Sequence, residues 1–434
     1  MFNELRTKIE AKRANIGIIG QGYVGLPLAV EFAKAGFNVT GFDNDEKKVS
    51  KINKGISYIL DVPSEDIKEL VSSGRLKATI DTRLLNKMDA IIICVPTPLR
   101  KTKEPDISYI LAASEEIAKN IRRGQLVILE STTYPGTTEE IILSKLDGDS
   151  LKVGKDFFLA FSPERVDPGN PKYKTKDITK IVGGVTPDCT ELARLLYSQV
   201  IKEVIPVSST RSAEMVKLLE NTFRSVNIAM VNELALMCNK MGLDVWEIIT
   251  AAKTKPFGFM PFYPGPGIGG HCIPLDPLYL SWKARQHGFE ARFIALADEI
   301  NSYMPHYVVD KIIAVLNKKK KALKGSNILI IGITYKKDIN DIRESPALEI
   351  ISSLIEKEAN VQCYDPLVSS FEVGDKKINT AAKLTKEDIT SSDLVVIITD
   401  HSGIDYKMIV DNASLIFDTR NALKDFRSEN IVRL

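Results

Sequence analysis

A strand, a glycine-rich turn and a helix follow one another near the N-terminus, and no other stretch restricts the possible folds as strongly. The apolar run at residues 15–19 leads into Gly20-Gln21-Gly22-Tyr23-Val24-Gly25, after which residues 26–35 favour a helix. Such glycines permit a tight turn, the approach of a pyrophosphate to the helix N-terminus, and close packing of helix on strand. Because a glycine turn can also serve packing alone, the motif needs support from the residues around it.

That support comes from Asp43, which ends a second predicted strand over residues 38–42. An acid at this spacing accepts hydrogen bonds from the adenosine ribose hydroxyls and repels a 2′-phosphate. The pattern therefore predicts NAD rather than NADP as the cofactor, and the alternative is that Asp43 is an ordinary turn residue. Lys48, in the following turn, either lies along the adenosine or is a solvated lysine.

Further strands are predicted at residues 89–95, 126–130, 157–161 and 181–185, so the first part should form a parallel, doubly wound sheet. Ligands of such sheets bind beyond the carboxyl ends of the strands. Polar residues follow three of these strands, among them Thr97, Thr132 and the turn Ser162-Pro163-Glu164-Arg165. Glu164 either binds a sugar hydroxyl and steers water, or forms a surface ion pair with Arg165.

A long helix is predicted from residue 212 to Met241-Gly242, and its broad apolar face indicates a spine between domains and a dimer interface. Lys217 and Asn221 are four residues apart and project from the same side of this helix. A lysine and an amide on one face can stabilise a developing alkoxide; alternatively, both are solvated surface residues. The spacing does not decide between these interpretations.

Cys272 stands one short turn before a helix that should begin at Asp276-Pro277. Four glycines precede the cysteine, so the backbone can approach a ligand closely, and the positive end of the helix favours a nucleophilic thiolate. The sequence therefore predicts a reactive cysteine rather than a small buried hydrophobic residue. His271 is its neighbour in an extended loop and should point the opposite way, which indicates a structural role.

The alternation of strands and helices restarts in the last part, with strands predicted at residues 327–332, 361–364, 394–399 and 415–417. The turn after Gly332 lacks the second and third glycines of the fingerprint, so this sheet should bind something other than a dinucleotide. Lys336, Arg343 and Arg420 lie near predicted strand ends or a helix start, where they either meet phosphate charges or are ordinary exposed cations. We predict two Rossmann-like doubly wound domains, residues 1–205 and 306–434, joined by a central helical domain at residues 206–305.

Composition excludes several classes of partner. The 434 residues include 58 Lys and Arg against 56 Asp and Glu, a net charge of +2 that favours neither nucleic acid nor a membrane surface. No apolar run approaches the roughly 18 residues that a bilayer span needs. The five cysteines form neither a disulfide framework nor a zinc pattern. We expect a cytoplasmic protein without a bound metal.

Six motifs spread along nearly the whole chain resemble those of the UDP-glucose/GDP-mannose dehydrogenase family and occur in the same order. The histidine before the cysteine is similar to the N-acetylhexosamine branch of the family, which implies a UDP-N-acetylhexosamine substrate, in particular UDP-N-acetylglucosamine. The motifs are Gly20-x-Gly22-x-x-Gly25, Ser131-Thr132, Ser162-Pro163-Glu164-Arg165, Lys217-x-x-x-Asn221, Gly269-Gly270-His271-Cys272 with Asp276, and Lys336-Lys337-Asp338 with Arg343-Glu344-Ser345.

The resemblance implies an NAD-binding N-terminal domain, a central helical dimerisation domain, a UDP-binding C-terminal domain, and a homodimer or higher homo-oligomer. It also implies that Thr97, Thr132 and Arg343 contact NAD. The residues that it assigns to the UDP-sugar are Glu164, Arg165, Lys217, Asn221, Tyr263, Gly269, Tyr335, Lys336 and Arg420.

The implied reaction oxidises a sugar CH2OH to a carboxylate with two NAD, in the synthesis of polysaccharide precursors. Cys272 would hold the intermediate aldehyde as a thiohemiacetal and then as a thioester. Lys217 and Asn221 would stabilise the oxyanions. Asp276 and Glu164, with Thr132, would activate or position water.

One departure from the family pattern concerns the sugar site. The glucose enzymes carry an arginine before the glycine loop, whereas residues 253–262 contain none, which leaves Lys255 and Arg292 as candidate replacements. UDP-glucose, UDP-GalNAc and UDP-ManNAc therefore stay open as substrates. Two other functions also stay open: a one-step hydroxyacid-type dehydrogenase, and a nucleotide-sugar-binding regulator without turnover.

Overall fold

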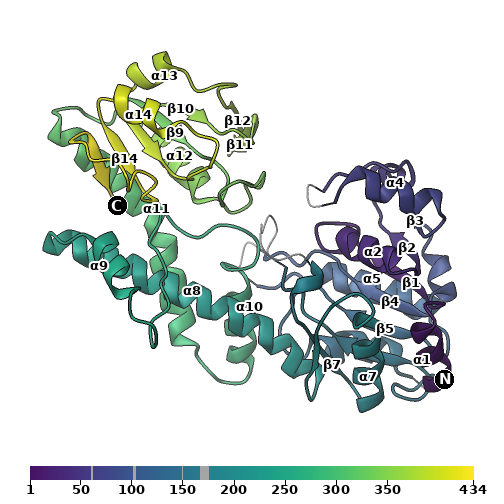
Figure 1. Cartoon of the computed structure of the whole chain (residues 1–434). Coiled ribbons are helices and arrows are strands. Elements are labelled where there is room, and N and C mark those ends of the chain that lie inside the picture. The colour runs from purple at the N-terminus through teal and green to yellow at the C-terminus, as the bar shows by residue number, and fades with distance from the viewer. Residues whose placement is uncertain (60–61, 101–103, 149, 167–174) are drawn as a thin grey trace. The chain divides into compact units, whose positions relative to one another are not determined.

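The computed structural model describes residues 1–434 except 60–61, 101–103, 149 and 167–174 (Figure 1). The chain divides into two units, each built around one sheet. The first comprises Met1–Glu220 with Leu278–Gly288, and the second comprises Asn221–Pro277 with Phe289–Leu434.

The first unit contains an eight-stranded sheet in the order β3-β2-β1-β4-β5-β6-β7-β8. All neighbouring strands pair in parallel except β6 and β7, which are antiparallel. A parallel neighbour needs a long crossover, usually a helix, whereas the described part of the connection before β7 holds one short 3-10 turn, η3 (Thr175–Asp177). The strands are β1 (Asn15–Ile19), β2 (Asn38–Phe42), β3 (Leu76–Thr79), β4 (Ala90–Ile93), β5 (Leu126–Leu129), β6 (Phe158–Phe161), β7 (Lys180–Gly184) and β8 (Val204–Pro206).

Alternating side chains of these strands build two hydrophobic cores, one on each face of the sheet. Ile92 and Ile128 belong to the core that α1, α2, α4 and α7 cover. Ile93 and Leu129, one residue further on, belong to the core beneath η1, α5 and η2, as the period of two in a strand requires. The helices are α1 (Phe2–Glu10), α2 (Gly25–Lys34), α3 (Glu46–Asn53), α4 (Ser64–Ser72), η1 (Thr82–Lys87), α5 (Ser108–Asn120), the π-helical η2 (Thr138–Leu143), α6 (Ser144–Leu146) and α7 (Pro187–Tyr197).

Four helices follow the first sheet along the chain: α8 (Thr210–Met241), α9 (Val245–Ala252), α10 (Asp276–Gln286) and α11 (Arg292–Lys318). The α9 N-terminus is capped, because the Asp244 carboxylate accepts from the backbone N–H of Trp246 (2.8 Å). Helix α11 continues through a buried Pro305, so the chain is helical on both sides of the predicted boundary at 305. The predicted domain limits stay predictions. In the described part of the chain, no helix is both long and apolar enough to cross a membrane.

The second unit contains a five-stranded, all-parallel sheet in the order β10-β9-β13-β14-β15 and a separate β11–β12 hairpin. Ile330 and Val396 pack with α11 and α12 on one face, and Ile331 and Val395 pack with α13 and α14 on the other. The elements are β9 (Asn327–Ile331), α12 (Pro346–Glu356), β10 (Asn360–Tyr364), β11 (Ser370–Val373), β12 (Lys376–Asn379), α13 (Lys386–Thr390), β13 (Leu394–Ile397), α14 (Tyr406–Asn412), β14 (Ile416–Asp418) and β15 (Ile431–Arg433).

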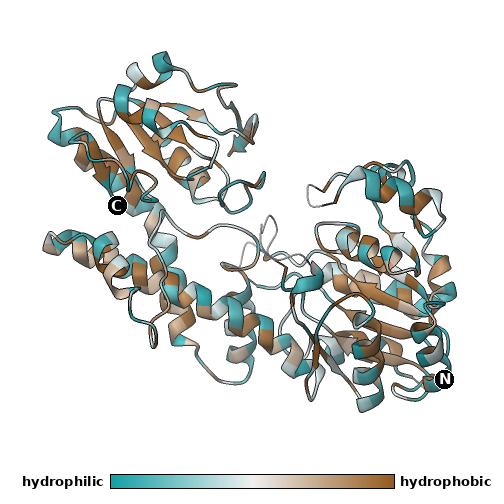
Figure 2. Cartoon of the chain, viewed as in Figure 1, coloured by the Kyte–Doolittle hydropathy of each residue, from teal (hydrophilic) through white to brown (hydrophobic). Residues whose placement is uncertain are grey.

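Hydropathy follows this layering. Figure 2 shows the strands of both sheets in brown, while the helices that cover them carry teal residues as well. The predicted fold class, two Rossmann-like sheets joined by a helical segment with a long helix, is confirmed.

Candidate active site

The three glycines of the turn between β1 and α2 have different structural roles. Gly20 has φ 90°, and a Cβ at this position would lie 2.4 Å from the Cys94 carbonyl oxygen. A Cβ at Gly25 would lie 1.8 Å from the Gly20 carbonyl oxygen. A Cβ at Gly22 would meet no described atom within 4 Å. The first and third glycines therefore serve packing, and the second leaves open space in front of the turn, as an approaching pyrophosphate requires.

Asp43 is anchored to this turn. Its Oδ2 accepts the backbone N–H of Gln21 (2.8 Å) and its Oδ1 accepts the backbone N–H of Asp45 (2.9 Å). Each carboxylate oxygen has two lone pairs, so the group keeps capacity for ribose hydroxyls. The Lys48 ammonium lies 3.5 Å from Asp43 Oδ2, and its predicted contact with adenosine stays a prediction. The exposed Tyr23 and the half-buried Val24 complete the turn.

Two predicted residues meet at the exit of β5. The Lys217 ammonium donates to the Thr132 hydroxyl (2.5 Å), and Lys217 is only 8% exposed. Thr97, at the exit of β4, is also buried, and its carbonyl oxygen accepts from the Tyr279 hydroxyl on α10 (2.6 Å). Sequence reasoning missed Tyr279, although an aromatic hydroxyl in the first turn of a helix that follows the cysteine was a visible signal.

Glu164 and Arg165 do not form the ion pair considered from the sequence. The Arg165 guanidinium donates to both carboxylate oxygens of Glu220 (3.1 and 2.5 Å). Glu164 Oε2 instead accepts from the Lys180 ammonium (3.1 Å). Both predicted residues therefore have partners on other elements, and their contacts with the sugar stay predictions.

A buried glutamate on α8 holds the loop that carries Thr132. Glu214 accepts from the backbone N–H groups of Gly136 (2.5 Å) and Thr138 (2.9 Å) and from the Thr138 hydroxyl (2.7 Å). Burial raises the pKa of its carboxyl to about 7. Lys217 lies three residues along the same helix, so α8 fixes this loop at two points. In the sequence, Glu214 lies at helical spacing from Thr210, Lys217 and Asn221, which places it on the same side of α8 as the two predicted site residues.

The thiol of Cys272 belongs to the second unit and is exposed, whereas the other four cysteines are buried. The Cys272 carbonyl oxygen accepts the backbone N–H groups of Leu275 (3.2 Å) and Asp276 (2.8 Å), which places the residue one turn before α10 as predicted. The Asn221 amide donates to Asp276 Oδ2 (2.6 Å), and both side chains are buried. The structure thus brings together a second pair of predicted residues.

The glycine loop before Cys272 lies against the turns of the second sheet. A Cβ at Gly269 would lie 2.5 Å from the Tyr335 Cβ, and a Cβ at Gly265 would lie 2.6 Å from the Arg420 guanidinium. The Gly270 N–H donates to the Arg343 carbonyl oxygen (3.0 Å). Bulkier residues cannot occupy these positions, so the glycines bring the loop to the residues predicted to bind UDP.

The remaining predicted cations and aromatics have the following surroundings. Burial and the nearby Arg343 lower the pKa of His271, and the Arg343 guanidinium itself pairs with Asp341 (2.6 Å). The half-exposed Tyr263 stacks on Trp246, with 6.3 Å between ring centroids. Lys336 is half-buried, and its carbonyl oxygen accepts from the Thr334 hydroxyl (2.9 Å). Lys255 lies over the Phe257 ring, and Arg292 is the first residue of α11.

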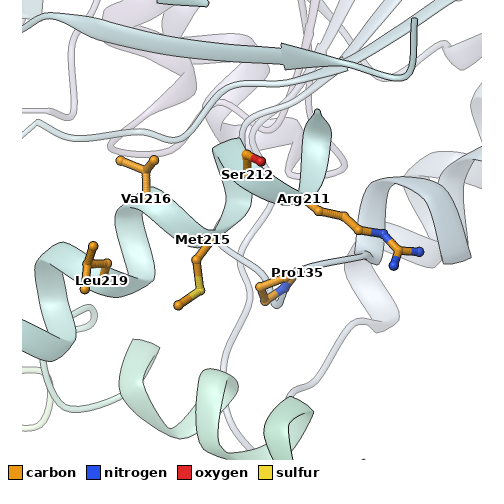
Figure 3. A pocket seen from close by; sticks show the side chains of 6 residues that line it. All are labelled: Pro135, Arg211, Ser212, Met215, Val216 and Leu219. Atoms are coloured by element: carbon orange, nitrogen blue, oxygen red, sulfur yellow. The ribbon is translucent and has the colours of Figure 1, made fainter. Parts of the chain in front are cut away.

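An open pocket of about 450 Å³ lies beside the first turns of α8. Figure 3 shows Met215 and Pro135 on the same side of this helix, with Arg211 at one end and Leu219 at the other. None of the described residues that line it is a predicted site residue. Its mixed, mostly apolar lining lacks the convergent polar groups of a catalytic site. Among the described residues, no group of His, Cys, Asp and Glu is arranged to hold a metal ion.

Comparison with known proteins identifies the sequence patterns. Profiles of the UDP-glucose/GDP-mannose dehydrogenase family match residues 14–201 (NAD binding domain), 211–303 (central domain) and 329–425 (UDP binding domain). A UDP-N-acetyl-D-glucosamine 6-dehydrogenase from Pseudomonas aeruginosa is 39% identical over 363 residues, which cover 83% of this chain and 84% of that protein. A UDP-N-acetyl-D-mannosamine dehydrogenase from Pyrococcus horikoshii is 36% identical over 94% of this chain and 96% of its own length.

Solved structures show the same likeness. The structure of a UDP-D-ManNAc dehydrogenase from Pyrococcus horikoshii superposes with a TM-score of 0.87 at 34% identity and covers 96% of this chain and 98% of that chain. An NDP-N-acetyl-D-galactosaminuronic acid dehydrogenase from Methanosarcina mazei superposes with a TM-score of 0.81 at 31% identity, over 99% of this chain and 97% of that chain. The names of these relatives refer to three different N-acetylhexosamine sugars, so the comparisons do not determine which sugar this protein uses.

Proposed function

Because the chain belongs to the UDP-glucose/GDP-mannose dehydrogenase family and is an NAD-dependent nucleotide-sugar dehydrogenase, we propose that it oxidises C6 of UDP-N-acetylglucosamine to a carboxylate. The observation that carries the mechanism is the exposed Cys272, one turn before a helix whose first residue, Asp276, binds Asn221. The choice of sugar rests on the relative at 39% identity. The product would be a uronic acid for polysaccharide synthesis.

The first turn of the chain fits the cofactor. Open space in front of Gly22 admits a pyrophosphate at the N-terminus of α2, and Asp43 is held where it can accept from ribose hydroxyls. NAD, when bound, supplies the acceptor for a hydride from C6. Thr97, Thr132 and Arg343 are proposed to hold and orient it.

The proposed chemistry balances as one CH2OH group, two NAD and one water giving a carboxylate, two NADH and three protons. In the first step a hydride leaves C6 and the alcohol proton passes to water, while the Lys217 ammonium stabilises the developing alkoxide. The Cys272 sulfur then bonds to the aldehyde carbon, which makes it tetrahedral, and Lys217 and Asn221 stabilise the oxyanion. Loss of the second hydride leaves a thioester, which water attacks with help from Asp276, Glu164 and Thr132.

We further propose that the protein works as a homodimer that pairs through α8. The support is a row of exposed apolar side chains on this helix, including Leu219 (60% exposed) and Met237 (48%). Sedimentation at micromolar concentration tests this, and Leu219→Glu should weaken the association. A monomer at that concentration contradicts the proposal.

The central experiment counts NADH per UDP-sugar consumed. We expect two NADH per UDP-N-acetylglucosamine; a ratio of one indicates a one-step dehydrogenase, and none indicates a binding protein. A panel with UDP-GalNAc, UDP-ManNAc and UDP-glucose identifies the sugar by the highest kcat/KM.

A cysteine variant tests the covalent step. Cys272→Ser should bind the UDP-sugar normally and yield no net acid, because a serine hydroxyl is far less nucleophilic than a thiolate. Cys363→Ser, at a buried cysteine, is the matched control. Wild-type turnover in Cys272→Ser would refute the thioester.

A further inference from the structure

A buried cation lies between two carboxylates at the strand ends of the first sheet. Lys180, the first residue of β7, donates to Glu130 Oε1 after β5 and to Glu164 Oε2 (3.1 Å). The Tyr197 hydroxyl on α7 donates to the other oxygen of Glu130 (2.6 Å). The exposed fractions of the Lys180, Glu130 and Glu164 side chains are 6%, 0% and 11%. Glu164 is the most accessible of these charged groups.

Stability alone does not explain the cluster. Removing charges from water costs about as much free energy as their mutual attraction returns, so apolar side chains of similar volume would hold the sheet at least as well. The three charges come from the end of β5, the start of β7 and the turn after β6, and Lys180 contacts both carboxylates. One of these carboxylates, Glu164, is a residue that the proposed reaction uses. This arrangement indicates that Lys180 and Glu130 serve Glu164.

Glu164 is fixed through both of its oxygens. Oε1 accepts the backbone N–H groups of Arg165 (2.8 Å) and Val166 (2.7 Å), and Oε2 accepts from Lys180. All of these donors favour the ionised form. Although burial opposes ionisation, the Lys180 charge and the hydrogen bonds hold the pKa of Glu164 well below its ordinary range.

Two further titratable groups face the cluster: Cys94, just after β4, and Tyr197 on α7. Burial, together with the charge of Glu164, raises the pKa of Glu130 to about 7. Burial and the charge of Glu130 also raise the pKa of Tyr197 and of Cys94, so both stay neutral. Glu164 also accepts the backbone N–H groups of Arg165 and Val166, and these contacts favour the ionised form of this carboxylate.

We propose that Lys180, braced by Glu130 and Tyr197, is a positioning residue that keeps Glu164 ionised and oriented to accept a proton from the hydrolytic water. This inference rests on the proposed function. In the step concerned, the water oxygen bonds to the acyl carbon, its proton passes to the Glu164 carboxylate, and the bond from carbon to the Cys272 sulfur breaks to release the thiolate.

The test compares Lys180→Met with Lys180→Arg, with Glu164→Gln, and with the control Lys202→Met at a lysine 70% exposed. With the best UDP-sugar of the panel, Lys180→Met should lower kcat roughly 100-fold and leave KM within about twofold. The acyl adduct should accumulate on Cys272 in quenched enzyme, as mass spectrometry detects. Lys180→Arg should retain most activity, and the acid limb of kcat should move to higher pH in Lys180→Met.

A double variant distinguishes positioning from a separate role. If Lys180 acts through Glu164, Lys180→Met adds nothing to the loss already caused by Glu164→Gln. The inference would be overturned if the double variant lost kcat by the product of the two single losses, or if the kcat of Lys180→Met stayed within about threefold of wild type. So would a loss of kcat without the Cys272 adduct.

A titration separates this inference from the proposed function. The 13C signal of the Glu164 carboxyl, assigned with Glu164→Gln, should titrate at least about one pH unit higher in Lys180→Met than in wild type. An unchanged midpoint refutes the role of Lys180. If wild-type protein makes fewer than two NADH, the proposed function fails, while this titration still decides whether Lys180 keeps Glu164 ionised.

Discussion

The two sheets begin with the same backbone device and use it differently. Gly20 and Gly332 both have positive φ (90° and 87°), and a Cβ on either would lie 2.4 Å from a carbonyl oxygen of the neighbouring strand exit. The second strand of each sheet ends in an aspartate that accepts an N–H from the glycine turn: Asp43 from Gln21 (2.8 Å) and Asp365 from Ile333 (2.6 Å).

The difference lies in what faces the aspartate. His401 fills this corner in the second sheet: its Nδ1 accepts the Asp338 N–H (3.0 Å), so the proton is on Nε2, which lies 3.1 Å from Asp365 and 3.0 Å from the Thr334 hydroxyl. In the first sheet the glycine turn leads directly into α2, and Gly22 keeps the space open. One turn is built to receive a dinucleotide, and its counterpart satisfies its polar groups internally.

The largest effect on stability should come from adding a methyl group to a glycine that lies against backbone atoms, and each turn contains such a glycine. Gly25→Ala and Gly332→Ala should each lower the free energy of unfolding by at least about 3 kcal/mol, because the new Cβ meets backbone at 1.8 and 2.4 Å. Urea denaturation measures this, with Gly22→Ala as the control. An equal loss in Gly22→Ala would remove the distinction between packing glycine and ligand glycine.

Two buried carboxyl groups, Glu214 in the first unit and Asp365 in the second, should make stability depend on pH in opposite directions. Burial raises the pKa of Glu214 from 4.5 to about 7 in the folded first unit, so the folded state binds the proton more tightly than the unfolded chain. Stability is therefore lost as pH rises from about 4.5 to about 7, by up to about 3 kcal/mol. In Glu214→Gln this loss should largely disappear.

Asp365 of the second unit has the opposite shift. Although burial opposes ionisation, hydrogen bonds from His401 and Ile333 lower its pKa below 3.8. The contribution of Asp365 to stability is fully present above pH 3.8 and is lost as pH falls through the lowered pKa. Hydrogen exchange between pH 2 and 8 tests both signs when wild type is compared with Glu214→Gln for the first unit and with Asp365→Asn for the second. A pH dependence that stays unchanged in either variant would contradict the role given to that residue.

A smaller effect should separate cofactor binding from folding. Gly22→Ala should weaken NAD binding on the order of 100-fold, about 2.7 kcal/mol, because its Cβ projects into the space that a pyrophosphate needs. UDP affinity should not change. Calorimetric titration with each ligand measures this, and wild-type NAD affinity would show that the open space is not the cofactor site.

His401→Ala should destabilise the second unit by about 2 kcal/mol, because it leaves the buried Asp365 and Thr334 with fewer partners. It should not give this unit any affinity for NAD, since the glycines that admit a pyrophosphate are absent. Denaturation and NAD titration of the variant check both statements. Newly gained NAD binding would show that His401 alone blocks the corner.

The smallest effect is expected for Asp43→Asn, which should weaken NAD about tenfold and narrow the preference over NADP. The stability should also fall slightly, because an amide oxygen can still accept the Gln21 N–H but the amide NH2 group cannot accept the Asp45 N–H. Steady-state KM values for the two cofactors measure this. An unchanged KM ratio would reduce Asp43 to a turn residue.

The sequence alone determined the features whose signals are local. Strands β1 and β2 begin and end at the predicted residues, because apolar runs bounded by polar turns need no distant partner to be recognised. The start of α10 after Cys272 was also predicted from local signals. The family and its NAD cofactor followed from motifs of this kind.

Only the tertiary structure decided which polar groups meet. Lys217 and Thr132 are 85 positions apart, Asn221 and Asp276 are 55 apart, and Lys180 and Glu130 are 50 apart. It also reversed β7, and it placed His401 against Asp365. The sequence shows which side chains are charged, but it does not show which of them become buried. A buried charge is costly in free energy unless another group pairs with it, and only the folded chain determines which distant residue is close enough to do so.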